Sequence, residues 1–297
     1  GVSYNDGSGV RFGGFVSFAD TLKKSTANTL KQAKELNVAV TIITGDSVRV
    51  AEAIGRETEL VTDAEQVIEA THFFNLPVEE QHARIANIRV FARTTPEQKL
   101  SLITLLKERY TVGFLGEGIN DAAALKAANV SLVVKSASDV ARETADIVLL
   151  KSDLRVIIDG IYLGRETHSN TLKYIRATLV SNFGNFYAVA VGSLFITFLP
   201  MLPKQLLLLN LLSDFPMMAI AFDRVSKAEI AHPQKYDFRS LYIIFITLGL
   251  VSTIFDFMWF ALFFKEGAGI LQTNWFIASI ITEIILLFSI RSMLPIE

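Results

Sequence analysis

The chain has 297 residues, a formal net charge of -2 and no cysteine. Without cysteine, disulfides and thiolate metal sites are excluded, and the near-neutral charge gives no reason to expect a nucleic-acid partner. The length suggests about two domains. Polarity is mixed over the first 170 residues, whereas long apolar runs begin near residue 180. The sequence begins without Met and shows no signal-peptide pattern, so we expect it to be a piece of a longer protein.

The first half predicts strands that alternate with helices. In chain order, the prediction is strand 14–19, helix 21–35, strand 38–43, helix 48–57, helix 79–86, strand 89–92, helix 96–108, strand 111–115, helix 121–128, strand 130–134, helix 137–144 and strand 147–150. This alternation predicts an α/β domain with a parallel sheet covered by helices on both faces. In such sheets, ligands bind at the carboxyl ends of the strands.

An acidic, glycine-rich loop follows the strand predicted at 111–115. Glu117 and Asp121 lie four residues apart, and Gly116 and Gly118 allow the backbone to approach a ligand closely. Two carboxylates alone would repel an anion, but with Mg²⁺ between them they form a phosphate site, because Mg²⁺ binds through carboxylates and phosphate oxygens. The alternative is an ordinary glycine turn with an acidic helix start.

Three further polar side chains lie where ligands of such a sheet bind. Thr44 and Asp46 follow the strand at 38–43, and Lys99 lies in the first turn of the helix after the strand at 89–92. A hydroxyl and an ammonium can hold phosphate oxygens while carboxylates hold Mg²⁺. Taken singly, Thr44 could be a helix cap and Lys99 a solvated charge.

The runs Thr44-Gly45-Asp46, 93–99 and 116–125 resemble the phosphorylation domain of P-type ATPases, which has the haloacid dehalogenase-like (Rossmann-like) fold. The resemblance implies ATP as substrate and Mg²⁺ as cofactor. It also implies that a threonine and a lysine contact the phosphoryl group, and that two acids of the glycine loop hold Mg²⁺. Carried over, the catalytic residues are Thr44, Gly45, Asp46, Lys99 and Asn120, and the metal residues are Glu117 and Asp121.

The chain departs from the family in this domain. The family usually has Asp where this chain has Glu117, and Pro where it has Ala123. The Asp-Lys-Thr-Gly-Thr motif that carries the family's nucleophile does not occur in the sequence. Asp20 is followed by Thr21, but its surroundings match a different segment of the family, so we do not predict Asp20 as the nucleophile.

The second half predicts a stalk helix at 152–177 and an all-α transmembrane domain at 178–297. Four apolar segments, about 178–199, 205–222, 241–264 and 275–291, are near the length that crosses a bilayer, although the last is short. The basic loop at 223–240 is expected to be cytoplasmic by the positive-inside rule. The phosphorylation domain, predicted at 1–151, is expected on the same side.

Polar residues in these segments require an explanation, because they are expensive in a bilayer. Asn182 and Asn185 share one helix face, as do Asn210, Ser213 and Asp214 on the next segment. Oxygen-rich faces with a carboxylate suit a hard cation. Hydrogen bonding between helices is the alternative and fits the asparagines nearly as well. Asp256 and Glu283 are weaker candidates than these residues, and Glu283, which lies in the middle of its span, is a possible further ligand.

The runs 181–185 and 210–214 resemble the fifth and sixth membrane helices of cation-pumping P-type ATPases, in which matching positions hold the transported ion. The runs 170–175 and 198–203 are similar to bacterial magnesium-transporting members. The resemblance implies transport of a divalent cation, Mg²⁺ before Ca²⁺, across a bacterial plasma membrane. By that comparison the actuator and nucleotide domains and several membrane helices are partners missing from this chain. The rival hypotheses are a non-catalytic remnant of a pump and a membrane-anchored phosphatase.

Overall fold

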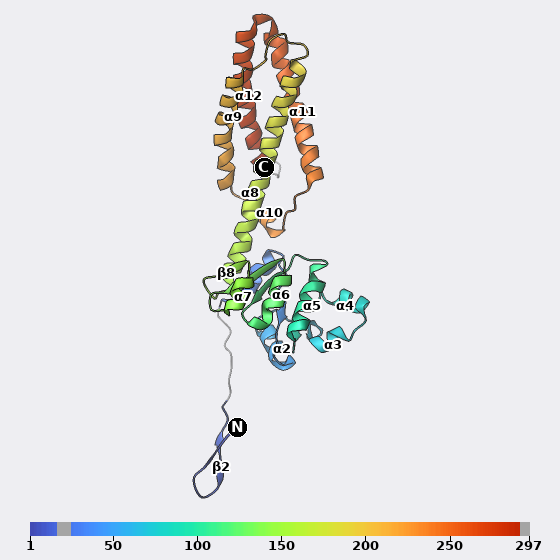
Figure 1. Ribbon diagram of the computed structural model, residues 1–297, viewed down its shortest axis with the longest axis vertical. Coiled ribbons are helices and arrows are strands. Elements are labelled where there is room, and N and C mark those ends of the chain that lie inside the picture. Colours follow the sequence, from blue (N-terminus) through green and yellow to red (C-terminus); the bar gives the residue numbers. More distant parts are fainter. Residues whose placement is uncertain (17–24, 292–297) are drawn as a thin grey trace. The chain divides into compact units, whose positions relative to one another are not determined.

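The computed structural model describes residues 1–16 and 25–291 and divides into two compact units, Gly1–Asp159 and Gly160–Glu297 (Figure 1). Asp20 and the predicted start of the helix at 21–35 lie outside the described residues. The first strands differ from the prediction. β1 (Val2–Asn5) and β2 (Val10–Gly14), which were not predicted, form an antiparallel hairpin connected by residues 6–9. Residues 17–19 of the strand predicted at 14–19 lie outside the described residues.

Apart from the β1-β2 hairpin, the described strands of the first unit are parallel, as predicted, but they pair in two groups. One sheet has the order β3-β5-β4, and the other has the order β6-β7-β8. The six strands are β3 (Ile42–Ile43), β4 (Val67–Glu69), β5 (Val90–Ala92), β6 (Gly113–Gly116), β7 (Val130–Val134) and β8 (Ile147–Leu149). β4 was not predicted, and only two residues of the strand predicted at 38–43 are paired.

Helices follow these strands and pack on them. They are α1 (Thr26–Glu35), α2 (Val48–Glu57), α3 (Ala70–Phe74), α4 (Val78–Arg84), α5 (Pro96–Lys107), α6 (Ala122–Ala127) and α7 (Asp139–Thr144). α5 begins where predicted, because Thr95 and Gln98 form a capping box and Pro96 occupies the first turn. Phe91 and Leu102 are fully buried in the core of the first sheet, and Val133 and Leu125 in that of the second.

The second unit is helical. α8 (Arg155–Gly192) is one continuous helix of 38 residues, so the predicted stalk and first span are a single element. The others are α9 (Pro203–Met218) with the 3-10 turn η3 (Ala219–Phe222), α10 (Lys227–Ala231), α11 (Phe238–Phe263) with η4 (Phe264–Glu266), and α12 (Ala268–Arg291).

Among the described residues, three helical segments are long and apolar enough to cross a membrane: Pro203–Phe222, Phe238–Glu266 and Ala268–Ile290. The last segment begins earlier than the one predicted at 275–291 and has 23 residues, so it is long enough to cross a bilayer. The span predicted at 178–199 is helical only to Gly192 and is not among the three, so it stays a prediction.

Glycines let α8 pack closely on α11 in the second unit. A Cβ on Gly249 would lie 2.8 Å from the Phe183 ring, and one on Gly192 would lie 2.9 Å from the Phe260 ring. Small residues at such contacts let helix backbones approach in a membrane. In Figure 1 the yellow C-terminal part of α8 runs beside α11.

Candidate functional site

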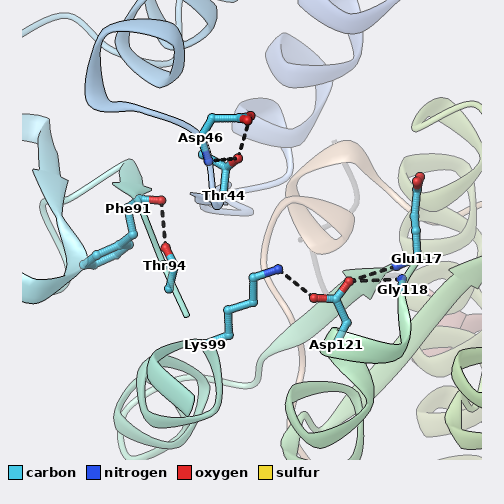
Figure 2. A network of polar contacts seen from close by, with 8 residues as sticks. All are labelled: Thr44, Asp46, Phe91, Thr94, Lys99, Glu117, Gly118 and Asp121. Atoms are coloured by element: carbon cyan, nitrogen blue, oxygen red, sulfur yellow. Dashed lines mark hydrogen bonds and ion pairs between the residues drawn. The ribbon is translucent and has the colours of Figure 1, made fainter. Parts of the chain in front are cut away.

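The acidic loop wraps around the carboxylate of Asp121. β6 ends at Gly116, and the 3-10 turn η2 (Ile119–Asp121) follows it directly. The amides of Glu117 and Gly118 donate to Asp121 Oδ2 at 3.1 and 3.2 Å (Figure 2). These two hydrogen bonds hold the Asp121 carboxylate in a fixed place at the end of β6.

Lys99 approaches the same carboxylate from the first turn of α5. Its Nζ lies 2.7 Å from Asp121 Oδ1, and the two side chains are 17% and 13% exposed. Burial raises the pKa of Asp121. The hydrogen bonds from Lys99 and from the Glu117 and Gly118 amides lower it by a larger amount, so the pKa lies below the ordinary value of an aspartate. Asp121 is therefore held ionised, and both of its oxygens are engaged.

Thr44 and Asp46 form a tight turn after β3. Thr44 Oγ1 donates to Asp46 Oδ2 at 2.8 Å and accepts from the Asp46 amide at 3.1 Å. The segment after β5 clamps this turn. The Thr94 amide donates to the Thr44 carbonyl at 3.0 Å, and the Arg93 amide donates to the Asp46 carbonyl at 2.9 Å. Arg93 has a φ of 51°, an uncommon backbone conformation outside glycine.

No separate role was predicted for Thr94, although it lies in the run 93–99 that resembles the family. Its side chain is 7% exposed, and its Oγ1 donates to the Phe91 carbonyl at 3.2 Å. Thr94 thus joins the end of β5 to the Thr44 turn. Only its place between a strand and a capped helix start could have indicated this.

The structure brings some predicted residues together and leaves others apart. Figure 2 shows the Lys99–Asp121 pair and the Thr44–Asp46 pair in one view, with Lys99 on α5 and the other three residues in the turns after β3 and β6. In this view the Glu117 side chain points away from Asp121, and Glu117 is exposed. Asn120 is also exposed, and a Cβ on Gly45 would meet nothing closer than 3.9 Å.

These residues fit Mg²⁺ in combination with phosphate. Within the described ranges, no group of three or more His, Cys, Asp or Glu side chains could hold a metal ion. Mg²⁺, however, binds with one or two carboxylates plus phosphate oxygens and water. Asp121 could supply one carboxylate if Lys99 shares or releases it, and Glu117 could supply a second if its exposed side chain rotates toward the site.

In the second unit, Glu283 of α12 accepts hydrogen bonds from two polar residues of α8. It is 6% exposed, and its Oε1 accepts hydrogen bonds from Ser181 Oγ at 2.6 Å and from Asn185 Nδ2 at 2.7 Å. Ser181 was not predicted as a site residue. Its position four residues before Asn185, on the same helix face, is the signal that could have found it.

The other candidate cation ligands are not gathered by the structure. Asn182, Asn210 and Asp214 are exposed. Ser213 is buried, and its hydroxyl donates to the Leu209 carbonyl at 3.0 Å and to the Asn210 carbonyl at 3.2 Å. Of the predicted cage, only Asn185 and Glu283 are therefore in contact with each other, while the exposed members lie on α8 and α9.

Two family profiles match this chain, one in each half. A family profile described as haloacid dehalogenase-like hydrolase matches residues 4–129, and one described as cation transporting ATPase, C-terminus, matches residues 198–296.

The chain is 41% identical to a magnesium-transporting P-type ATPase of Salmonella typhimurium and 40% identical to one of Escherichia coli. Each alignment covers 94% of this chain and 32% of the relative. A calcium-transporting ATPase of Bacillus subtilis is 28% identical over 94% of this chain and 33% of its own length. The chain thus spans about a third of the length of the curated relatives it matches.

Proposed function

Because this chain belongs to the P-type cation ATPases, we propose that it is part of a pump that moves a divalent cation, Mg²⁺, across a bacterial plasma membrane. ATP hydrolysis through an aspartyl-phosphate drives the transport. The first unit, with the cytoplasmic phosphorylation site, handles the phosphoryl group. The nucleophilic aspartate, the nucleotide and actuator domains and further membrane helices come from the rest of the protein.

One contact carries this proposal: the pairing of Lys99 Nζ with Asp121 Oδ1 at 2.7 Å, across two separate elements of the sheet edge. This ammonium and carboxylate form a neutral pair. When both ligands bind, the ammonium can pair with the phosphoryl group and the carboxylate can pair with Mg²⁺. The phosphoryl oxygens attract Lys99, which leaves Asp121 Oδ1 available to the metal. We therefore expect each of the two ligands to favour binding of the other.

The residues of the chain then have distinct tasks. Lys99 and the Thr44 hydroxyl hold phosphoryl oxygens, and Asp46 orients that hydroxyl. Asp121 and Glu117 hold Mg²⁺, which when bound offsets the negative charge of the phosphoryl group. Gly45 keeps the turn free of a side chain beside the phosphate, and Asn120 faces the solvent side of the loop.

For the transported ion, the higher identity to magnesium-transporting relatives supports Mg²⁺ over Ca²⁺. The ligands proposed are Asn182, Asn185, Asn210, Ser213, Asp214 and Glu283. Three of these are exposed, and we infer that helices from the rest of the pump cover them, since a bare carboxylate in a membrane span is costly.

The test is phosphorylation by radiolabelled ATP. The whole protein, encoded by the reading frame that includes these residues, should form an acid-stable, hydroxylamine-sensitive phosphoenzyme, and Lys99→Ala should reduce its formation at least a hundredfold. The chain described here should form none. A whole protein without phosphoenzyme, or phosphorylation of the isolated chain, would each contradict the proposal.

A non-catalytic remnant of a pump is the second candidate, because Glu117 is exposed and points away from Asp121. Glu117→Asp in the whole protein separates the two. For a working pump we expect the phosphorylation rate to change less than about threefold, since either carboxylate can reach the metal directly or through water. A gain of more than a hundredfold would favour the remnant.

A further inference from the structure

Two hydrogen bonds converge on the backbone carbonyl of Phe91, in the middle of β5. The Thr44 amide donates to this oxygen at 2.9 Å. The Thr94 hydroxyl donates to it at 3.2 Å, as Figure 2 shows. Phe91 is fully buried and Thr94 is 7% exposed, so the bond between them is shielded from water and strengthened by its surroundings. One carbonyl of a core strand thus joins the turn after β3 to the segment after β5.

Thr94 contacts Thr44 a second time, through its backbone. The Thr94 amide donates to the Thr44 carbonyl at 3.0 Å. Both the amide and the carbonyl of Thr44 are therefore bonded to the segment 91–94, which leaves its main chain little freedom. Gly45 and Asp46 are exposed, so packing does not hold this turn in place, and β3 pairs through only two residues. The hydrogen bonds from the segment after β5 are what fix the turn.

The residue before Thr94 adds a further bond through an uncommon backbone conformation. Arg93 has a φ of 51°, and its amide donates to the Asp46 carbonyl at 2.9 Å. A residue other than glycine is strained in this left-handed region and persists there only where its surroundings hold it. Here β5 and the buried Thr94 lie on either side of it. The two consecutive amides of Arg93 and Thr94 thus bind the two ends of the same turn, residues 44–46.

The same segment begins α5 and carries Lys99. Thr95 caps the helix directly after Thr94, and its carbonyl accepts from the Lys99 amide at 2.9 Å. The capping box and the first helical turn hold the backbone from Thr94 to Lys99 in one conformation. Thr94 is therefore tied to the Thr44 turn on one side and to the start of the Lys99 helix on the other. The Thr44 hydroxyl and the Lys99 ammonium are the two groups that we propose to hold phosphoryl oxygens.

We propose that Thr94 is a positioning residue for phosphoryl transfer, which sets the Thr44 hydroxyl at the required distance from the Lys99 ammonium. Thr94 does not itself contact the phosphoryl group, because it is buried and its hydroxyl proton is donated to the Phe91 carbonyl. Placement matters for the rate, since a misplacement of about 1 Å can cost about a hundredfold. The inference rests on the proposed function for the identity of the ligand. The alternative is a buried threonine whose hydroxyl is only satisfied by a nearby carbonyl.

The test variants change the hydroxyl and little else. Thr94→Val keeps the shape of the side chain but removes the donor to Phe91, whereas Thr94→Ser keeps the donor. In the whole protein, we expect Thr94→Val to reduce the maximal rate of phosphoenzyme formation from radiolabelled ATP at least tenfold. The ATP concentration that gives half of this rate should change less than twofold, since we propose that the nucleotide domain lies outside this chain. Thr94→Ser should restore the rate to within threefold of wild type.

Thr58→Val is the matched control. Thr58 is 4% exposed, and its hydroxyl donates to the Ile54 carbonyl at 2.8 Å, so it too is a buried threonine bonded to a local carbonyl. It follows the C-terminal end of α2, whereas the Thr44 turn precedes the N-terminal end of the same helix. Thr58→Val should lower thermal stability about as much as Thr94→Val does, yet leave the rate of phosphoenzyme formation unchanged. A purely structural role for Thr94 predicts equal rates in the two variants.

Hydrogen exchange of the full chain, measured by mass spectrometry, gives a readout that does not depend on ATP. Thr94→Val should speed the exchange of the amides in the segment 42–47 at least tenfold, because the bonds that hold this segment to Phe91 and Thr94 lose one member. Thr58→Val should leave the exchange of this segment as it is in wild type.

Several results would overturn the positioning role: a wild-type rate or unchanged exchange in Thr94→Val, a rate in Thr94→Ser as low as that in Thr94→Val, or an equal loss of rate in Thr58→Val. If Thr94→Val does not fold, as judged by circular dichroism, Thr94→Cys decides by the same comparisons, because a thiol is a weak donor. A whole protein that forms no phosphoenzyme but shows the expected exchange pattern would reject the proposed function and leave the link between Thr94 and the Thr44 turn standing.

Discussion

Gly116 and Asp121 are packed so closely that a Cβ added to Gly116 would lie 2.8 Å from the Cβ of Asp121. The same Cβ would lie 3.2 Å from the Phe114 ring, so it has no room on either side. The absence of a side chain at this position is what lets the loop fold its carboxylate back onto the strand end.

Gly116→Ala should therefore displace Asp121 from Lys99 and destabilise the loop by about 1–3 kcal/mol, as overpacking does in well-packed sites. Hydrogen exchange of the β6 and α6 amides, measured on the full chain by mass spectrometry, reports this local free energy. Gly118→Ala is the matched control, because its Cβ would meet nothing closer than 3.8 Å and its φ is -105°. Equal effects of the two changes would contradict this account of the packing.

The lowered pKa of Asp121 makes the stability of this loop depend on pH. A carboxyl whose pKa is depressed in the folded state stabilises it above the unfolded pKa of about 3.9. That contribution is lost as the pH falls through the lower folded value. Lys99→Met removes a charge-assisted bond, so it should cost about 1–3 kcal/mol at pH 7. The difference from wild type should shrink toward pH 3, measured by hydrogen exchange at each pH. A constant difference across that range would show that Lys99 acts through packing alone.

The same substitution tests how metal and phosphate share the site. Without the ammonium, Asp121 Oδ1 has no side-chain partner, so we expect Lys99→Met to bind Mg²⁺ about tenfold more tightly in the absence of phosphate, a gain of about 1.4 kcal/mol. Calorimetry of the full chain in phosphate-free buffer measures it. Weaker binding in the variant would mean that Lys99 does not compete with the metal.

Lys173 on α8 is held in a buried ionic cluster with the segment that follows α9. It is 2% exposed, and its Nζ lies 3.5 Å from Asp223 and 3.9 Å from Glu229. Glu229 also accepts from Ser169 Oγ at 2.9 Å. Lys173→Met should destabilise the second unit by about 1–3 kcal/mol, because it removes a buried ammonium that interacts with both carboxylates.

Thermal unfolding of the full chain in nanodiscs, followed by tryptophan emission, tests the effect of Lys173→Met. Lys204→Met, an exposed lysine at the start of α9, serves as the control and should stay within about 0.5 kcal/mol of wild type. Comparable melting of the two variants would rule out the cluster as a stabilising element.

The close packing of α8 on α11 gives a last prediction. Gly249→Ala should lower stability by about 1–3 kcal/mol, since its Cβ would meet the Phe183 ring at 2.8 Å. Gly164→Ala on α8 is exposed and meets nothing within 4 Å, so it should raise stability by up to about 1 kcal/mol through helix propensity. Thermal unfolding of the two variants should therefore show a loss of stability for Gly249→Ala and no loss for Gly164→Ala. Equal losses would contradict close packing at Gly249.

The convergence of Lys99 and Asp121 could be predicted from the sequence because it depends only on strand order and strand ends. The direction of the Glu117 side chain could not, since it is set by rotation about bonds that no spacing constrains. Asn182 and Asn185 were predicted on one face, yet only Asn185 contacts Glu283. That difference depends on where α12 packs, which is a long-range contact.

α8 contains no proline between Arg155 and Gly192, whereas α9 carries Pro216 within its last turn. Twelve residues separate Lys173 from Asn185, about 18 Å along the axis at the rise of an α-helix. A continuous α-helix without proline moves largely as a rigid body, so a translation or rotation at one end also displaces the other end. We therefore expect any displacement of α8 that separates Lys173 from Asp223 to move Asn185 relative to Glu283 as well.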